Sequence, residues 1–143
     1  DAFLTLDGML ETFLTVLDQM EVYPSALAAE VERYLPFLLS TSFLMAAVKG
    51  GAGRETAHAA VKEHALAVMA DLRAGRATRN DLASRLAADP RLGLDAATAE
   101  RLLAEGRSSL GAATVQIDAF AGAAREFVAG VPGAAEYVPG AIL

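Results

Sequence analysis

Apolar residues recur at helical spacing along the first part of the chain. The series is Phe3, Leu6, Leu10, Phe13, Leu17 and Met20, while Asp7, Glu11, Thr15 and Asp18 line another face. This period of about 3.6 residues predicts an amphipathic helix. Leu4, Leu14 and Val16 widen the apolar arc. We therefore expect this helix to have neighbours on more than one side, as in a helix bundle.

Proline, glycine and capping residues divide the rest of the chain into six further predicted helices. These run from Pro24 to Arg33, Phe43 to Lys49, Arg54 to about Arg73, Asn80 to Ala88, Asp95 to Glu105 and Ala112 to Ala129. Asn80 and Asp95 are the expected N-caps of their helices, because their side-chain oxygens can accept a backbone N–H. The segment from Gly130 to Leu143 lacks periodicity and is predicted to be loop.

Two boundaries near residue 36 follow from local chemistry. Leu35-Pro36-Phe37 is expected to break the helical course, because proline lacks the backbone N–H. Ser40 or Thr41 is expected to cap the next helix, which the glycines at 50 and 51 end. The glycine-rich run 50–53 follows a helix and lacks the spacing of a phosphate-binding loop, so we interpret it as a turn.

The composition favours a protein built only of helices. Hydrophobic residues make up 54% of the 143 positions, and Ala and Leu carry this fraction. Few β-branched or aromatic residues are present, which is typical of closely packed helices. The length suits one hydrophobic core. We predict an all-α fold without strands.

Charge and cysteine content limit the partners. The 18 acidic residues outnumber the 12 basic ones, and no basic run forms, so we expect no nucleic-acid partner. The absence of cysteine excludes disulfides and thiolate metal sites and fits a cytoplasmic location. Pro36, Lys49 and acidic residues interrupt the apolar stretches before the roughly 20 residues that a membrane span needs. We expect a soluble protein without a membrane partner.

One basic ridge is the candidate binding feature. Arg54, His58 and Lys62 recur every fourth residue on one predicted helix, an arrangement that invites an acidic partner or an anionic ligand. Glu55 and Glu63 flank the ridge and can offset its charge. The alternative interpretation is therefore a solvated charged face.

No reactive motif is found beside this ridge. His58 and His64 lie about 120° apart round a helix, so we predict no metal site. Asp7 and Glu11 share a face but have no visible pocket that would make them a general acid and base. The sequence contains no nucleophile elbow, no zinc-protease motif and no carboxylate cluster for Mg²⁺. We predict no catalytic residue in this chain.

Short motifs in a fixed order carry a family resemblance. Two stretches lie near the start, Asp1 to Leu4 with Asp7, and Val22 to Pro24 with Leu35 to Phe37. The more specific motifs are Leu44 to Gly51, Gly53 to Glu55, Ala57-His58, Val61 to Ala65, Asn80 to Leu82, Arg85-Leu86, Leu110 to Ala113 and Val115-Gln116. Together they resemble the C-terminal region of adenylosuccinate lyase, a member of the fumarase/aspartase superfamily. The first two stretches resemble its last long bundle helix and the segment leading into its third domain. The resemblance covers nearly the whole chain.

The resemblance implies a homotetrameric enzyme of purine biosynthesis that needs no cofactor. It would remove fumarate from adenylosuccinate to give AMP, and from SAICAR to give AICAR, by base-assisted β-elimination. In the family, a histidine of an earlier domain and a serine on a Ser-Ser-x-Met-Pro loop transfer the protons. An Arg/Ser/Arg cluster just upstream of the stretch matched by Asp1 holds the nucleotide phosphate. None of these motifs is present here, so no catalytic residue is carried over.

On this resemblance, residues 1–21 are the last helix of the central bundle, and residues 22–143 are the C-terminal helical domain. The four copies would associate through the first helix, and the substrate would bind to upstream segments. The chain opens on Asp1 inside a helical pattern, so we expect a fragment that is inactive when isolated. The alternative class is a non-enzymatic helical module for protein interaction or ligand binding.

Overall fold

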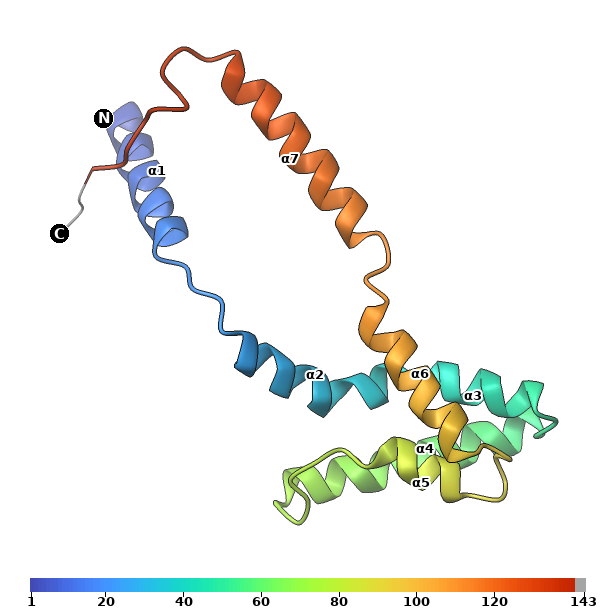
Figure 1. Cartoon of the computed structure of the whole chain (residues 1–143). Helices are drawn as coiled ribbons and strands as arrows, with labels where there is room; N and C mark the ends of the chain where they lie inside the picture. Colours follow the sequence, from blue (N-terminus) through green and yellow to red (C-terminus); the bar gives the residue numbers. More distant parts are fainter. Residues whose placement is uncertain (141–143) are drawn as a thin grey trace. The chain divides into compact units, whose positions relative to one another are not determined.

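The computed structural model describes residues 1–140 and contains only helices as regular structure (Figure 1). The seven helices of this range are α1 (Ala2–Asp18), α2 (Pro24–Leu38), α3 (Ser40–Lys49), α4 (Arg54–Arg73), α5 (Leu82–Ala88), α6 (Ala96–Ser108) and α7 (Ala113–Ala129). No strand occurs in the described range. The all-α prediction is therefore confirmed. None of these helices combines the length and apolar content that crossing a bilayer requires.

The helices belong to two compact units, each described by itself. The larger unit, Pro24–Leu110, contains α2 to α6, and the smaller unit contains α1, α7 and their adjoining segments. The sequence-based division into a bundle helix (residues 1–21) and a C-terminal domain (residues 22–143) rests on the family resemblance. That division stays a prediction.

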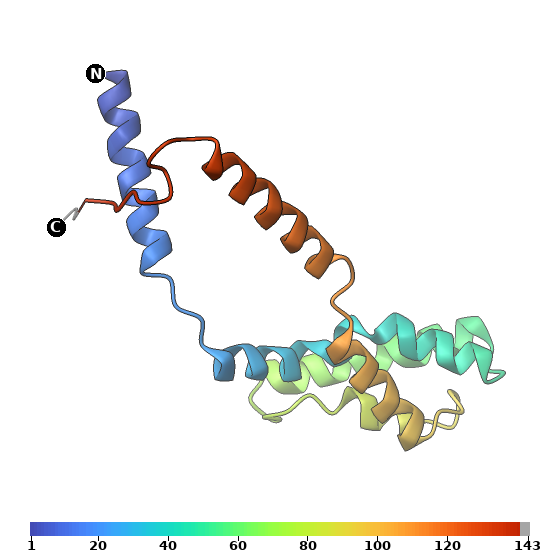
Figure 2. The ribbon, with the colours of Figure 1, turned by 45° about the horizontal axis from the view of Figure 1, so that its top comes forward.

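The core of the larger unit forms around one face of α4. This helix packs against α3 and α5, and α5 packs in turn against α6 (Figure 2). Two alanines on the buried face of α4 let neighbouring backbones approach closely. The core side chains are Phe43, Ala47, Ala57, Ala60, Val61, Val68, Leu82, Ala83, Leu86, Leu92, Leu94 and Ala99. They come from α3 to α6 and from the loop between α5 and α6.

A close approach fixes how α6 meets the junction of α2 and α3. A Cβ atom at Gly106 would lie only 2.5 Å from Cδ1 of Leu39. Since real Cβ atoms do not come so near, any larger residue at this position would force Leu39 to move. Glycine therefore permits this contact inside a helix, where it otherwise costs about 1 kcal/mol relative to alanine.

The predicted helix break at Leu35-Pro36-Phe37 is wrong. Pro36 lies inside α2, which continues to Leu38. The missing N–H of proline removes one helical hydrogen bond, but Leu35 and Pro36 are both buried, and their burial offsets that loss. The backbone N–H of Leu39 still donates to the Leu35 carbonyl at 3.0 Å, so α3 follows almost at once.

The predicted start and cap of the next helix are also wrong. α3 begins at Ser40 instead of Phe43, and Leu39 occupies the N-cap position without a side-chain cap bond. Because α2 runs on to Leu38, the chain is already helical before this point, and the Leu39 carbonyl accepts the Phe43 N–H at 3.0 Å as the first hydrogen bond of α3. The expected caps, Ser40 and Thr41, therefore lie inside the first turn of the helix.

The predicted cap at Asp95 is confirmed, because its Oδ1 accepts the Thr98 N–H at 2.7 Å. The predicted cap at Asn80 is wrong by one residue: Asp81 is the N-cap of α5, and Asn80, just before it, accepts the Leu82 N–H through its Oδ1 at 3.0 Å. The run 50–53 is a turn in which Gly51 has φ +103°, a conformation that favours glycine. α4 spans the predicted residues, and α6 runs beyond the predicted Glu105 to Ser108.

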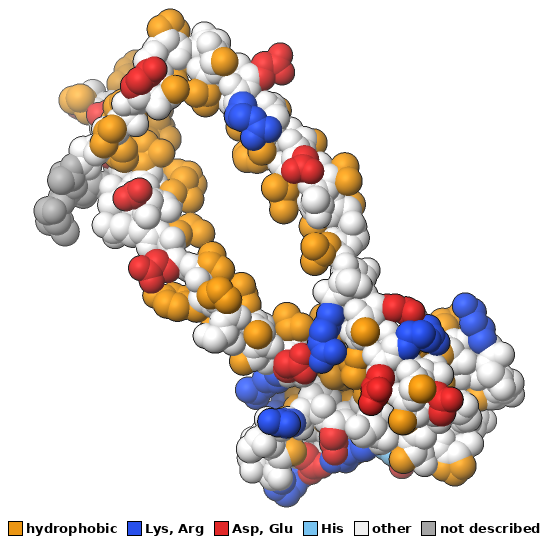
Figure 3. Space-filling model, viewed as in Figure 1, with side chains coloured by type: hydrophobic (Ala, Val, Ile, Leu, Met, Phe, Trp, Pro, Cys, Tyr) orange, Lys and Arg blue, Asp and Glu red, His pale blue; other side chains and the backbone are white. Residues whose placement is uncertain are grey.

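The smaller unit leaves its helices largely uncovered. No residue of α1 or α7 is buried, and Phe3 and Phe120 are 87% and 77% exposed. Figure 3 shows hydrophobic side chains along both helices. The segment after α7 has no regular structure through Gly140, as predicted, and the Gly140 N–H donates to Glu11 Oε2 at 2.7 Å. The prediction for residues 141–143 lies outside the described residues.

We predict that Leu86→Ala lowers the free energy of unfolding of the larger unit by about 2–5 kcal/mol, because it opens a cavity in a fully buried site. Urea unfolding followed by circular dichroism measures this. Leu66→Ala is the matched control, since Leu66 on α4 is 62% exposed and its removal should change stability by less than about 0.5 kcal/mol. Equal losses in the two variants would contradict the assignment of the core.

Candidate functional site

The predicted basic ridge is an exposed row on α4. α4 runs unbroken from Arg54 to Arg73, so steps of four residues place Arg54, His58 and Lys62 on one face. All three side chains are exposed, and none makes an ion pair within residues 1–140. The structure therefore brings the three residues together. Their part in substrate binding stays a prediction.

The two acidic residues beside the ridge differ in their surroundings. Glu63 forms an ion pair with Arg91, with 2.9 Å between Oε2 and Nη1. Its charge is thereby directed away from the ridge. Glu55 lies in the first turn of α4, where a carboxylate favours the helix dipole. Only Glu55 is left to offset the ridge, so the ridge is more positive than the sequence suggested.

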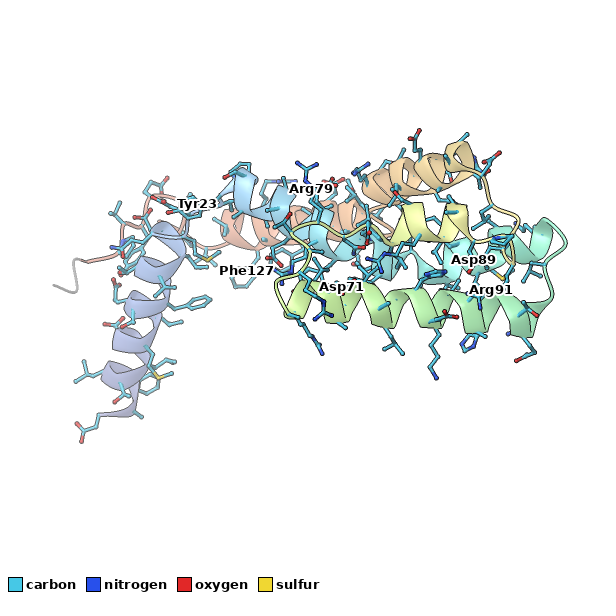
Figure 4. All side chains as sticks on the ribbon, turned by 90° about the horizontal axis from the view of Figure 1, so that it is seen from below. Tyr23, Asp71, Arg79, Asp89, Arg91 and Phe127 are labelled. Carbon is cyan, nitrogen blue, oxygen red and sulfur yellow. The ribbon has the colours of Figure 1, made fainter. Side chains whose placement is uncertain are left out.

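An ion-pair network joins α4 to the loop between α5 and α6 (Figure 4). Its centre is the Asp89 carboxylate, whose side chain is only 6% exposed. Oδ2 of Asp89 lies 2.8 Å from Nε2 of His64 and 2.6 Å from Nη2 of Arg91. The backbone N–H of Arg91 donates to Oδ1 of Asp89 at 2.9 Å. Arg91 also pairs with Glu63, so two residues of α4, His64 and Glu63, belong to the network.

The charged neighbours of Asp89 determine its protonation state. The Arg91 guanidinium holds the pKa of the Asp89 carboxyl well below its usual range, against the opposing effect of burial. Asp89 and then Glu63 raise the pKa of Arg91. A carboxylate that stays ionised and fully hydrogen-bonded cannot act as a proton donor near neutral pH. The network therefore suits a structural connection between α4 and the loop.

A second ion-pair group connects α4 with α5. Asp71 on α4 bonds to Arg85 of α5 at 3.0 Å and to Arg76 at 2.9 Å, and Arg85 also bonds to Asp81 at 3.0 Å. Arg85 and then Arg76 lower the pKa of Asp71. These partly exposed pairs fix the orientation of the two helices more than they add stability.

No reactive cluster is present among the described residues. Within residues 1–140, no three His, Asp or Glu side chains are placed to hold a metal ion. Every buried side-chain nitrogen and oxygen of this range has a hydrogen-bond partner. His58 is exposed on the surface of α4. His64 is partly buried and pairs with Asp89.

Sequence reasoning missed the Asp89 network. His64 and Asp89 are 25 residues apart, and no spacing rule connects a helix with a distant loop. From the sequence alone, Asp89 followed by Pro90 indicates no more than the end of a helix. The short step from Asp89 to Arg91 was the one local signal, since aspartate often accepts the N–H two residues on.

These features define a helical packing domain whose buried polar groups are paired and whose one basic row is exposed. Comparison with known families then gives the identity. The chain belongs to the family described as adenylosuccinate lyase C-terminus, whose model matches residues 36–120. The family inferred from the ordered motifs is therefore confirmed.

Two yeast enzymes are similar to parts of the chain. The adenylosuccinate lyase of Saccharomyces cerevisiae is 31% identical over 90 residues, which cover 62% of this chain and 18% of the yeast protein. The adenylosuccinate lyase of Schizosaccharomyces pombe is 32% identical over 62 residues, which cover 43% of this chain and 13% of that protein. The matches thus span less than a fifth of either relative.

We predict that Asp89→Asn destabilises the larger unit by about 1–3 kcal/mol at neutral pH, because hydrogen bonds to a charged group are lost at a buried site. The folded-state pKa of Asp89 lies below its unfolded value. Its stabilisation is therefore present above about pH 4 and lost as the pH falls further. Urea unfolding of both proteins from about pH 6 down to about pH 3 should show the difference shrinking.

Asp81→Asn is the matched control for this experiment. Asp81 also faces an arginine, but its side chain is 48% exposed, so the variant should cost less than Asp89→Asn. A pH-independent difference between the native chain and Asp89→Asn would contradict the role given to the ionised Asp89.

Proposed function

We propose that this chain is the C-terminal part of an adenylosuccinate lyase, an enzyme of purine biosynthesis in the cytoplasm. The whole protein would cleave adenylosuccinate to AMP and fumarate, and SAICAR to AICAR and fumarate. The family match over residues 36–120, which is more than half of the chain, carries this proposal. The two yeast relatives bear the same enzyme name over parts of their length, which supports it.

The reaction needs groups that the described residues do not offer. In the β-elimination, a base takes the proton from the carbon beside a carboxylate, and the C–H electron pair forms the new double bond. The C–N bond breaks, and an acid protonates the leaving nitrogen. The buried carboxylate of Asp89 is ionised and paired, and its partner His64 is held by the same contact. Catalysis is therefore assigned to parts of the enzyme outside this chain.

The larger unit then has a supporting role. Its core and its two ion-pair groups hold α4 between α3 and α5 in one orientation. α4 in turn presents the row of Arg54, His58 and Lys62 to the exterior. In the whole enzyme this unit would buttress the catalytic body, and any contact with substrate would come through that row.

The first helix supports a homotetramer. Most of its apolar residues are exposed in the single chain, among them Leu10 at 53% and Phe13 at 59%, and none is buried. A face of this kind is covered in a stable protein, and a bundle with other copies of the same helix would cover it. We propose that α1 is a bundle helix through which four copies associate.

A helical module for interaction or ligand binding is the second candidate. The larger unit has its own hydrophobic core, which is the observation that favours an independent module. Such a module would not need the other parts of a lyase. Activity of the longer protein therefore separates the two candidates.

We predict that a protein in which this chain follows a complete set of upstream lyase segments releases fumarate from adenylosuccinate. The 143-residue chain alone should release none, because the family motifs that transfer the protons are not present in its sequence. Absorbance of the fumarate and AMP formed measures both. An inactive longer protein would contradict the proposed function, and turnover by the chain alone would contradict the assignment of catalysis to other segments.

We predict that the 143-residue chain self-associates and that Leu10→Glu weakens this association, because a charge then falls in the apolar face of α1. Light scattering gives the mass of each protein. Thr12→Glu is the matched control: Thr12 lies on the opposite side of the same helix and is exposed, so it should leave the mass unchanged. A native chain that stays monomeric would favour the module.

A further inference from the structure

A small hollow opens between α3 and α4, beside the basic row. Its volume is ≈ 220 Å³, against ≈ 610 Å³ for a larger hollow of α3 and α6. Two side chains of α3 and two of α4 supply its polar lining, and apolar side chains of the same two helices form its base, called the floor here. The polar residues are Ser40, Thr41, His58 and Lys62, and the floor includes Leu44 and Val61.

The α4 side of the hollow carries positive charge. His58 and Lys62 lie one helical turn apart, with about 5–6 Å between their Cβ atoms. Glu63 points elsewhere, since it lies about 100° round the helix from Lys62 and pairs with Arg91. The remaining acid on α4 near this face is Glu55, one turn before His58. An anion in the hollow would therefore meet a net attraction.

The α3 side adds hydroxyl groups and no negative charge. The helix has the sequence Ser40 to Lys49 without an Asp or Glu. Serine and threonine in helices often bond back to the carbonyl four residues earlier, as Thr5, Thr12 and Thr15 do here at 2.8–3.0 Å. Ser40 and Thr41 form no such side-chain bond within residues 1–140, unlike Thr5, Thr12, Thr15 and Ser108. Both hydroxyls are therefore free to face a ligand.

The size of the hollow limits what it can hold. Pockets for drug-sized ligands measure roughly 300–1,000 Å³. The ≈ 220 Å³ found here is smaller and open to solvent on one side. A single phosphate group or a small dicarboxylate fits this space, whereas a whole nucleotide would extend out of it.

We propose that this hollow binds a small oxyanion, either a phosphate group or a carboxylate. Lys62 donates a charge-assisted hydrogen bond to it, an N–H of the His58 imidazole donates a second hydrogen bond, and the Ser40 and Thr41 hydroxyls complete its coordination. This site goes beyond the proposed function, because it needs neither turnover nor the missing segments of a lyase.

The test is a binding titration of the 143-residue chain followed by the amide signals in nuclear magnetic resonance. Inorganic phosphate and fumarate are added in separate arms, each compared with sodium chloride at equal ionic strength. Saturable shifts are expected at the amides of Ser40, Thr41, His58 and Lys62. Saturation by phosphate alone or by fumarate alone supports the site and identifies which oxyanion it takes.

Variants show whether the binding belongs to this hollow. Lys62→Met keeps the apolar stem but removes the charge, so it should weaken binding about tenfold or more. Lys49→Met is the matched control, because Lys49 ends the neighbouring helix α3 and does not line this hollow. Thermal unfolding checks that both variants keep the fold. Ser40→Ala should weaken binding less than Lys62→Met, because only a neutral hydrogen bond is lost.

Two results would overturn the proposal. One is that neither anion shifts these amides beyond the chloride baseline. The other is that Lys49→Met weakens binding as much as Lys62→Met, which would mean attraction to charge in general. Because the titration measures binding to the isolated chain, its outcome is separate from that of the fumarate-release assay.

Discussion

The packing of α4 is the constraint on which the larger unit depends. Ala57, Ala60, Val61 and Val68 form a narrow apolar stripe on this helix, and the small alanines let α3 and α5 come close. Once this stripe is buried, the rotation of α4 is set. His64 then faces the α5–α6 loop, where it meets Asp89, and Arg54, His58 and Lys62 face solvent. The ion-pair network and the exposed basic row are both consequences of that one buried stripe.

The helices of the smaller unit show that apolar content does not by itself produce burial. α1 has a clear apolar face, yet Leu10 and Phe13 remain exposed, as does Phe120 of α7. In the larger unit, side chains of the same kind are buried because four neighbouring helices provide complementary surface. On the proposed function, other copies of the chain would cover the apolar face of α1.

Much of the fold could be predicted from the sequence because helix periodicity and caps are local signals. Asp95 capped its helix as expected, Asn80 lies one residue before the cap of α5, and the glycine run 50–53 formed a turn. Pro36 misled the prediction, because its effect depends on burial in the finished unit and not on its neighbours in sequence. The candidate site likewise has one part that local sequence signals predict and one part that depends on tertiary structure. The steps of four along α4 predicted the basic row, whereas pairing of His64 with Asp89 depends on tertiary structure.

The distribution of paired and unpaired charges connects the fold with the proposed role. Asp71, Arg85, Asp89 and Arg91 are held in ion pairs that join helices, so their charges are used in positioning. Lys62 and His58 differ because no ion pair holds them among the described residues, and they stand beside free hydroxyls of α3. A side chain needed only for solubility could occupy any exposed position. Two donors one turn apart over a small hollow instead combine charge with shape, and the proposed oxyanion site rests on that combination.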